Sequence, residues 1–228
     1  MQWPTPAALR SRESSGASPD MGFDLLAPHY DWMEALTAGQ RLQRARTAWL
    51  EELRGCRRIL SVGEGHGKFA EACAAKFPDA ELTCVEGSKK MLARARARLA
   101  GSPAKINWVE SDIFQWTPAG KYDAIVTCFF LDCFTAEQLA VVMQKLAGCA
   151  APGAAWIAVD FSVPASGLAR WRAQAVHALM YGFFRVATSL PARHMTAPDA
   201  LLRHQGFHLE GRREFEWGLL RADLWRRS

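Results

Sequence analysis

Residues 59–69 read ILSVGEGHGKF, and this stretch decides the fold. Three apolar residues, Ile59, Leu60 and Val62, predict a short buried strand. Glycines then stand at alternate positions, 63, 65 and 67, where the backbone can turn sharply and leave room for a ligand. An alanine-rich stretch at 68–77 follows and predicts a helix. A strand, a glycine turn and a helix N-terminus together predict the cofactor-binding corner of an open α/β sheet.

The rest of the chain alternates between apolar runs and helical patterns. Strands are expected at 58–62, 81–85, 106–110, 124–128, 155–161, 207–210 and 216–225, and helices at 68–77, 89–99 and 136–147. This alternation predicts parallel strands with helices on both faces. The turn between the last two strands is too short for a parallel crossover, so these two strands are expected to pair antiparallel. The predicted class is α/β, a Rossmann-like seven-stranded sheet that is mostly parallel and has an antiparallel last strand.

Composition divides the chain into three parts. Residues 1–20 are rich in proline, serine and charge and are expected to form a flexible tail. Residues 21–54 carry apolar residues at helical spacing and predict an N-terminal helical cap, broken near Gly39. Residues 55–228 form the cofactor-binding domain, with an insertion at 165–195. The insertion combines aromatic residues with arginines, which fits a lid over a substrate, a membrane-surface contact, or an extra packed helix in a monomer or a homodimer.

Charge and cysteine usage restrict the function. The net charge of +5 is modest and comes without a run of five or six like charges, so no nucleic-acid partner is expected. The six cysteines are scattered without a CxxC pair, which favours a reducing compartment and no metal site. The N-terminus shows no signal peptide, and the longest apolar stretch, 176–190, is too short to span a bilayer. A cytoplasmic protein is therefore expected.

The spacing of the glycines and two downstream acids narrow the choice of cofactor. Dinucleotide-binding sites use G-x-G-x-x-G, but here the third glycine, Gly67, comes one residue earlier. Glu86 ends the second predicted strand, about 20 residues after the first glycine, where an acid can bind the hydroxyls of a ribose. Asp112 follows the third strand and can accept a hydrogen bond from an adenine amino group. The order of these landmarks favours an adenosine-containing cofactor other than a dinucleotide.

With these landmarks in order, residues 59–161 resemble the class I S-adenosylmethionine-dependent methyltransferases. The resemblance implies S-adenosyl-L-methionine as the cofactor. The glycine turn would lie against its methionine part, Glu86 would bind its ribose, Asp112 and Ile113 would hold its adenine, and the end of the fourth strand would face the substrate. The implied cofactor-binding residues are Gly63, Glu64, Gly65, Gly67, Glu86, Gly87, Asp112, Ile113, Cys128 and Phe129.

One position departs from the family pattern. The family usually carries an acid two residues before the first glycine, where it helps to organise the amino group of the methionine part. This chain has Ser61 there. Glu64, inside the turn, is the residue that could compensate.

Three residues are candidates for the active site beyond the cofactor. Asp132 follows the fourth strand at the edge of the sheet where ligands bind, and it could act as a general base or could cap the helix that starts near residue 136. His29 and Tyr30, in the N-terminal cap, are expected either to close the cofactor pocket or to pack in the core.

The overall layout resembles small-molecule methyltransferases related to the ubiquinone/menaquinone C-methyltransferases and the phospholipid N-methyltransferases. No Asn-Pro-Pro-Tyr or Asp-Pro-Pro-Tyr follows the fourth strand, so methylation of the amino groups of nucleic-acid bases has little support. The expected activity is methyl transfer to a small apolar or aromatic molecule. Two alternatives stay open: a scaffold or regulatory protein that binds the cofactor without catalysis, and a membrane-peripheral lipid or quinone methyltransferase that uses its insertion.

Overall fold

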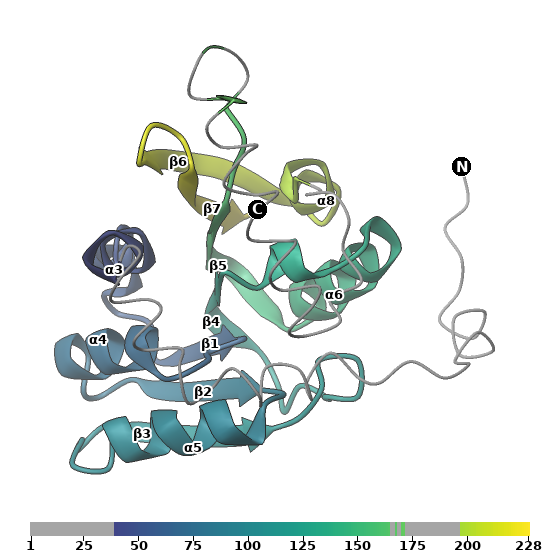
Figure 1. The fold of residues 1–228 in the computed structure, drawn as a ribbon. Helices are drawn as coiled ribbons and strands as arrows, with labels where there is room; N and C mark the ends of the chain where they lie inside the picture. Colours follow the sequence, from purple (N-terminus) through teal and green to yellow (C-terminus); the bar gives the residue numbers. More distant parts are fainter. Residues whose placement is uncertain (1–38, 165–166, 168–169, 172–196) are drawn as a thin grey trace, which may run out of the picture.

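The computed structural model describes residues 39–164, 167, 170–171 and 197–228 (Figure 1). The described elements, in chain order, are α3 (Gly39–Arg46), η2 (Leu50–Leu53), β1 (Arg58–Val62), α4 (Lys68–Lys76), β2 (Glu81–Glu86), α5 (Lys89–Arg98), β3 (Lys105–Glu110), β4 (Tyr122–Cys128), η3 (Leu131–Cys133), α6 (Ala136–Gly148), β5 (Ala150–Phe161), α8 (Asp199–His204), β6 (Phe207–Phe215) and β7 (Leu220–Arg227). Most of the predicted N-terminal cap and insertion lies outside the described residues.

Seven strands form one sheet in the order β3-β2-β1-β4-β5-β7-β6. Strands β1 to β5 pair in parallel, and β7 runs antiparallel to both of its neighbours, β5 and β6. The predicted fold class is therefore confirmed, including the antiparallel last strand.

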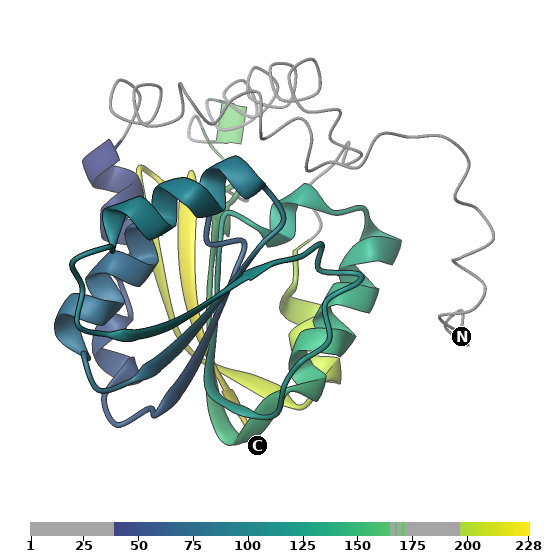
Figure 2. The ribbon, with the colours of Figure 1, turned by 90° about the horizontal axis from the view of Figure 1, so that it is seen from below.

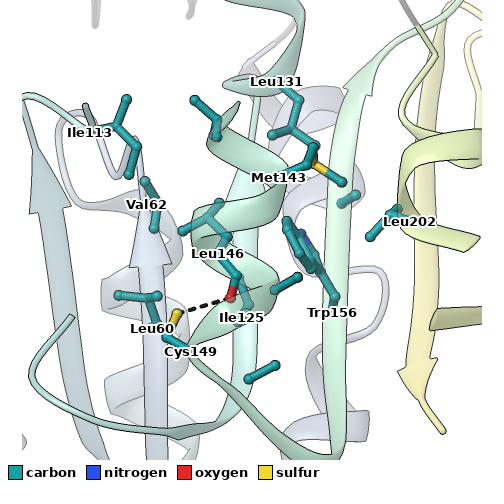
Figure 3. Close-up of a cluster of buried hydrophobic side chains, with 14 of the residues drawn as sticks. Leu60, Val62, Ile113, Ile125, Leu131, Met143, Leu146, Cys149, Trp156 and Leu202 are labelled. Carbon is teal, nitrogen blue, oxygen red and sulfur yellow. Dashed lines mark hydrogen bonds between the residues drawn. The ribbon is translucent and has the colours of Figure 1, made fainter. Parts of the chain in front are cut away.

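Helices cover both faces of the sheet (Figures 1 and 2). Buried residues of α3 and α4, and Leu99 directly after α5, pack against one face with strand residues such as Ile59 and Val126. On the other face, α6 and α8 pack over the adjacent strand positions. Figure 3 shows this second core, where Leu60 and Trp156 from the sheet lie beside Met143 and Leu146 from α6. The alternation of strand side chains between two cores explains why the strands read as continuous apolar runs.

Local sequence fixes where two of the site-bearing helices begin. Ser88 caps α5, its side chain accepting a hydrogen bond from the Met91 amide at 3.2 Å. Thr135 and Gln138 form a reciprocal capping box at the start of α6. Such caps satisfy amide groups that have no partner within the helix.

The parallel register brings the ends of four strands to one edge. Val62 of β1 pairs with Val85 of β2 and with Thr127 of β4. Glu86 pairs with Glu110 at the end of β3. The segments that follow these strands therefore meet at the carboxyl edge of the sheet, where open α/β sheets bind ligands.

The predicted boundaries of the last three strands were wrong. Strand β5 begins at Ala150 rather than at residue 155. The final strands were expected at 207–210 and 216–225, but β6 continues to Phe215 and the turn lies at 216–219. The polar stretch 211–214 stays in β6 because Arg212 pairs with the buried Asp223 of the neighbouring β7. The turn instead uses Glu216 and Trp217, both at positive φ, and Gly218.

The helical pattern at 42–53 also differs from the prediction. It divides into α3 and the short 3-10 helix η2 rather than forming one helix. None of the helices among the described residues has the length and apolar character needed to cross a membrane.

Candidate cofactor and active site

A cavity of about 150 Å³ opens at the carboxyl edge of β1, β2, β3 and β4. Its walls come from the glycine turn, the ends of the neighbouring strands, the loop after β4 and one residue of α3. The lining residues are Arg46, Val62, Gly63, Glu64, Gly65, His66, Phe69, Val85, Glu86, Gly87, Met91, Ser111, Asp112, Ile113, Phe114, Cys128, Phe129, Phe130, Cys133, Phe134 and Gln138. Nine of the ten sequence-predicted cofactor residues are therefore brought together around one cavity.

The glycine turn needs its glycines for two reasons. Gly63 has a φ of 68° and Gly65 a φ of 64°, a left-handed conformation that L side chains rarely adopt. A Cβ on Gly63 would lie 2.3 Å from Cδ2 of Phe130, so the turn and the loop after β4 approach closely only without a side chain there. The turn thus leaves backbone rather than side chains facing the cavity.

Gly67 is the one predicted cofactor residue that does not line the cavity. It precedes α4 with a φ of 87°, and a Cβ there would lie 2.9 Å from Cα of Ala95 in α5. In the structure this glycine therefore permits close packing between α4 and α5.

Glu86 connects the end of β2 to the glycine turn. Its Oε2 accepts a hydrogen bond from the Gly65 amide at 2.7 Å, and its Oε1 accepts one from the Ser88 amide at 2.9 Å. Both bonds fix the direction of the carboxylate, which lines the cavity beside Gly87. A carboxylate held in this way is suited to accept hydrogen bonds from the hydroxyl groups of a ribose.

The loop after β3 carries Asp112 and Ile113 at the cavity wall. Asp112 Oδ1 accepts a hydrogen bond from the Phe114 amide at 2.7 Å, which closes a local turn. From α6, Lys145 Nζ donates to the carbonyl groups of Ile113, Phe114 and Trp116 at 2.8, 2.7 and 2.8 Å. Burial lowers the pKa of Lys145. This lysine attaches the whole loop to α6, and no motif in the sequence indicates this role.

Glu64 turns its carboxyl group inward, beneath the glycine turn. The residue is 8% exposed. Its Oε2 accepts a hydrogen bond from the Ser61 hydroxyl and its Oε1 accepts one from the Ala70 amide at 2.8 Å. Burial raises the pKa of Glu64 to about 7, against the opposing effects of these hydrogen bonds and of Arg46. The carboxyl group therefore titrates near neutral pH and lies at the end of β1, beside Ser61.

Arg46 is a charged residue of the cavity that sequence reasoning missed. It belongs to α3, is 6% exposed and lines the cavity. Its guanidinium lies 5.1 Å from the ring centroid of Phe129. Phe129 itself has a φ of 54°, an uncommon conformation for an aromatic residue and one that is often found at functional sites. A buried cation beside the glycine turn is suited to bind a carboxylate.

Comparison with known proteins shows what the chain is similar to. A sequence model of a methyltransferase domain matches residues 59–153. Trans-aconitate 2-methyltransferase of Acidovorax ebreus is 31% identical over 165 residues, which cover 65% of this chain and 61% of that protein. The ubiquinone/menaquinone biosynthesis C-methyltransferase of Syntrophotalea carbinolica is 30% identical over 149 residues, or 64% of this chain and 62% of that protein. Residues 59–153 are therefore similar to a methyltransferase domain, in agreement with the resemblance to the class I S-adenosylmethionine-dependent methyltransferases.

Solved structures agree on the fold of this chain. The N-methyltransferase NodS from Bradyrhizobium japonicum, in complex with S-adenosylhomocysteine, aligns with a TM-score of 0.69 at 16% identity and covers 92% of this chain and 99% of that one. Magnesium protoporphyrin IX methyltransferase from Synechocystis, also with the bound product, aligns with a TM-score of 0.60 at 18% identity, over 97% and 94% of the two chains. The matches to the two curated relatives span about three fifths of their length.

The residues of the cavity fit S-adenosylmethionine, the cofactor that the resemblance implies. Glu86 presents a fixed carboxylate for the ribose, and Asp112 and Ile113 stand where the adenine is expected. The amino acid part carries an ammonium and a carboxylate. Arg46 provides a positive charge beside the glycine turn, and Glu64, with a pKa of about 7, provides a carboxyl group there that can ionise.

The three predicted catalytic residues are placed differently. Asp132 lies in η3, partly buried, and does not line the cavity, although its neighbour Cys133 does. His29 and Tyr30 lie outside the described residues.

Burial raises the pKa of both Cys128 and Cys133, so these thiols stay protonated and do not act as nucleophiles at neutral pH.

Proposed function

We propose that this protein is a methyltransferase that transfers the methyl group of S-adenosyl-L-methionine to a small apolar or aromatic molecule. One observation carries the proposal: the glycine turn, Glu86 and Asp112 converge on one cavity at the carboxyl edge of the sheet. When bound, S-adenosylmethionine supplies a methyl group that is already activated by a positively charged sulfur. The main task left to the protein is to orient the acceptor and exclude water.

The residues that we assign to the cofactor divide by chemistry. Glu86 binds the ribose, and the loop of Asp112 and Ile113 holds the adenine. Arg46 binds the carboxylate of the amino acid part, while Glu64 faces its ammonium. Both charged residues are buried, so a bound ligand would experience little screening by water.

The aromatic lining of the cavity supports an apolar or aromatic acceptor. The Phe130 and Phe134 rings meet edge to face with centroids 5.0 Å apart, and Phe134 meets Phe114 in the same way at 5.7 Å. Phe129 packs on Phe161 at 5.2 Å. Rings in such arrangements offer faces and edges to a planar substrate.

Isothermal titration calorimetry tests the cofactor assignment. Both S-adenosylmethionine and S-adenosylhomocysteine should bind at micromolar concentration. If neither binds at millimolar concentration, the proposal is wrong. Substitution of Glu86 by Ala should weaken binding, whereas Glu110→Ala, at the paired end of β3 and outside the cavity, should leave it unchanged.

Formation of S-adenosylhomocysteine with pools of phenols, quinols, amines and carboxylic acids tests the activity and its substrate class. Turnover confined to phenols and quinols would support the proposal. Turnover confined to polar acids would overturn the substrate class. Vesicles of anionic phospholipid are tested as a further acceptor. Tight cofactor binding with no turnover in any pool and none with the vesicles would favour the non-catalytic scaffold instead.

A further inference from the structure

Asp160 is a buried acid that the cofactor assignment does not use. It lies near the end of β5, at the same carboxyl edge as the cavity, and is 8% exposed. Its Oδ1 accepts a hydrogen bond from the Phe130 amide at 3.1 Å, and the Leu131 amide also interacts with the carboxyl group. Both amides stand at the start of η3, where a helix leaves amide groups without partners of its own. A side chain of β5 therefore caps the loop that follows β4.

The loop that Asp160 caps has an unusual backbone conformation at Phe129. This residue has a φ of 54°, in the left-handed region. A bulky residue stays in that region only where its surroundings impose it. Two hydrogen bonds to β5 do so here: the Phe129 amide donates to the Val159 carbonyl at 2.6 Å, and the next amide, that of Phe130, donates to Asp160.

Phe129 and Phe130 form one wall of the cavity, beside the glycine turn. The Phe129 ring centroid lies 5.1 Å from the guanidinium carbon of Arg46, the cation that we assign to the ligand carboxylate. Phe130 approaches the turn so closely that a Cβ on Gly63 would lie 2.3 Å from its ring. A shift of this loop would therefore move both the ring beside Arg46 and the wall next to the glycine turn.

We infer that Asp160 is a positioning residue that holds Phe129 against Arg46 and so places this cation for the carboxylate of S-adenosylmethionine. The inference rests on the proposed function. Asp160 itself does not line the cavity, so it acts through the backbone of residues 129–131 and not by contact with the ligand.

This role requires an acceptor oxygen on Asp160 rather than a negative charge. Its Oδ2 is buried and has no hydrogen-bond partner in the described part of the chain. Burial also raises the pKa of Asp160 well above its ordinary range. A neutral side chain of the same shape that keeps one acceptor should therefore hold the loop as well as the acid does.

Calorimetry with two ligands tests the role. The second ligand, 5′-methylthioadenosine, has the adenosine part of S-adenosylhomocysteine but no amino acid part. Asp160→Leu removes both acceptor oxygens and should raise the Kd for S-adenosylhomocysteine about tenfold, while the Kd for 5′-methylthioadenosine changes less than about twofold. Asp160→Asn keeps one acceptor and should leave both values within about twofold of the wild type. Equal losses for the two ligands in Asp160→Leu would overturn the inference.

A double-mutant cycle tests whether Asp160 acts through Arg46. In the Arg46→Met background, Asp160→Leu should cause no further loss of affinity for S-adenosylhomocysteine, because both changes affect the same contact. An undiminished further loss would contradict this route.

Asp123 offers a matched control for the removal of a carboxyl group that binds backbone amides. Its Oδ2 accepts the amides of Arg57 and Arg58 at 2.8 and 2.9 Å, at the opposite end of β4 from the cavity. Asp123→Leu should lower stability against urea and leave both Kd values unchanged. A rise in the Kd for S-adenosylhomocysteine equal to that of Asp160→Leu would make the effect a general consequence of lost stability and overturn the inference.

Two further measurements apply even if Asp160→Leu does not fold. In the wild type the Phe130 amide should exchange with solvent about as slowly as the Phe129 amide, because both donate to buried acceptors of β5; rapid exchange of Phe130 alone would overturn the inference. Phe129→Leu removes the ring beside Arg46 and should reproduce the selective loss of affinity for S-adenosylhomocysteine, whereas unchanged affinity would overturn the route through this ring. Failure of the wild type to bind S-adenosylhomocysteine would overturn the proposed function instead.

Discussion

The Ser61 hydroxyl donates a hydrogen bond to Glu64 Oε2 at the base of the glycine turn. The other oxygen of Glu64 accepts the Ala70 amide at 2.8 Å, so one carboxyl group joins the end of β1 to the first turn of α4. Related methyltransferases usually carry their acid at the position of Ser61. In this chain the acid stands three residues later, and its side chain returns to the same strand end.

The first prediction concerns the stability of Glu64→Gln. The pKa of Glu64 is about 7 in the folded protein and 4.5 ordinarily. Between these values the folded protein holds a proton that the unfolded chain has released, so this group makes stability fall as pH rises from about 4.5 to about 7. The contribution is on the order of 3 kcal/mol. Urea denaturation should show that the free energy of unfolding falls less between pH 5 and pH 8 in the variant than in the wild type.

The exposed Glu110 gives the matched control for this experiment. Glu110→Gln should lose as much stability between the two pH values as the wild type does. An equal loss in Glu64→Gln would contradict the assignment of the titration to Glu64.

The second prediction concerns Glu86. In Glu86→Ala the Gly65 and Ser88 amides lose their acceptor and the ribose loses its carboxylate. Hydrogen bonds to charged groups contribute about 1.5–3 kcal/mol each. The Kd for S-adenosylhomocysteine should therefore rise at least tenfold by calorimetry, and Glu86→Gln should give a smaller rise because the amide retains one acceptor. An unchanged Kd in both variants would show that the ribose binds elsewhere.

The sequence predicted those parts of the site that depend on residue type and chain order. Alternating glycines after an apolar run require a tight turn, and an acid at the end of a strand lies at the edge where ligands bind. Gly63, Glu86 and Asp112 could be placed on these grounds alone.

Other parts depend on contacts between distant segments, which a single sequence does not reveal. Arg46 points into the cavity because α3 packs on α4 and on β7, and nothing beside it in the sequence indicates a ligand. The turn between β6 and β7 was misplaced because Arg212 finds its partners at Asp199 and Asp223. Gly67 has the spacing of a cofactor-binding glycine in the sequence. Its close approach to Ala95 depends on how α5 packs against α4, which the sequence does not show.

The third prediction separates Arg46 from the rest of the cofactor site. Arg46→Met should weaken the binding of S-adenosylhomocysteine about tenfold or more, since it removes the cation that we assign to the ligand carboxylate. Binding of 5′-methylthioadenosine, which has the adenosine part but no amino acid part, should change less than twofold. Arg46→Lys should retain part of the affinity. Equal losses for both ligands would indicate a general structural role for Arg46.

The fourth prediction concerns Lys145 and the loop that carries Asp112 and Ile113. In Lys145→Met the carbonyl groups of Ile113, Phe114 and Trp116 lose their common donor, and the loop is no longer attached to α6. Amide hydrogen exchange should accelerate across 112–116, and the Kd for adenosine should rise about tenfold because the adenine wall is no longer held in place. Lys121→Met is the matched control: Lys121 donates to the carbonyl of Gly148, away from the cavity, and its loss should change neither quantity. Unaltered exchange in Lys145→Met would show that the buried contacts of Ile113 and Trp116 hold the loop without the lysine.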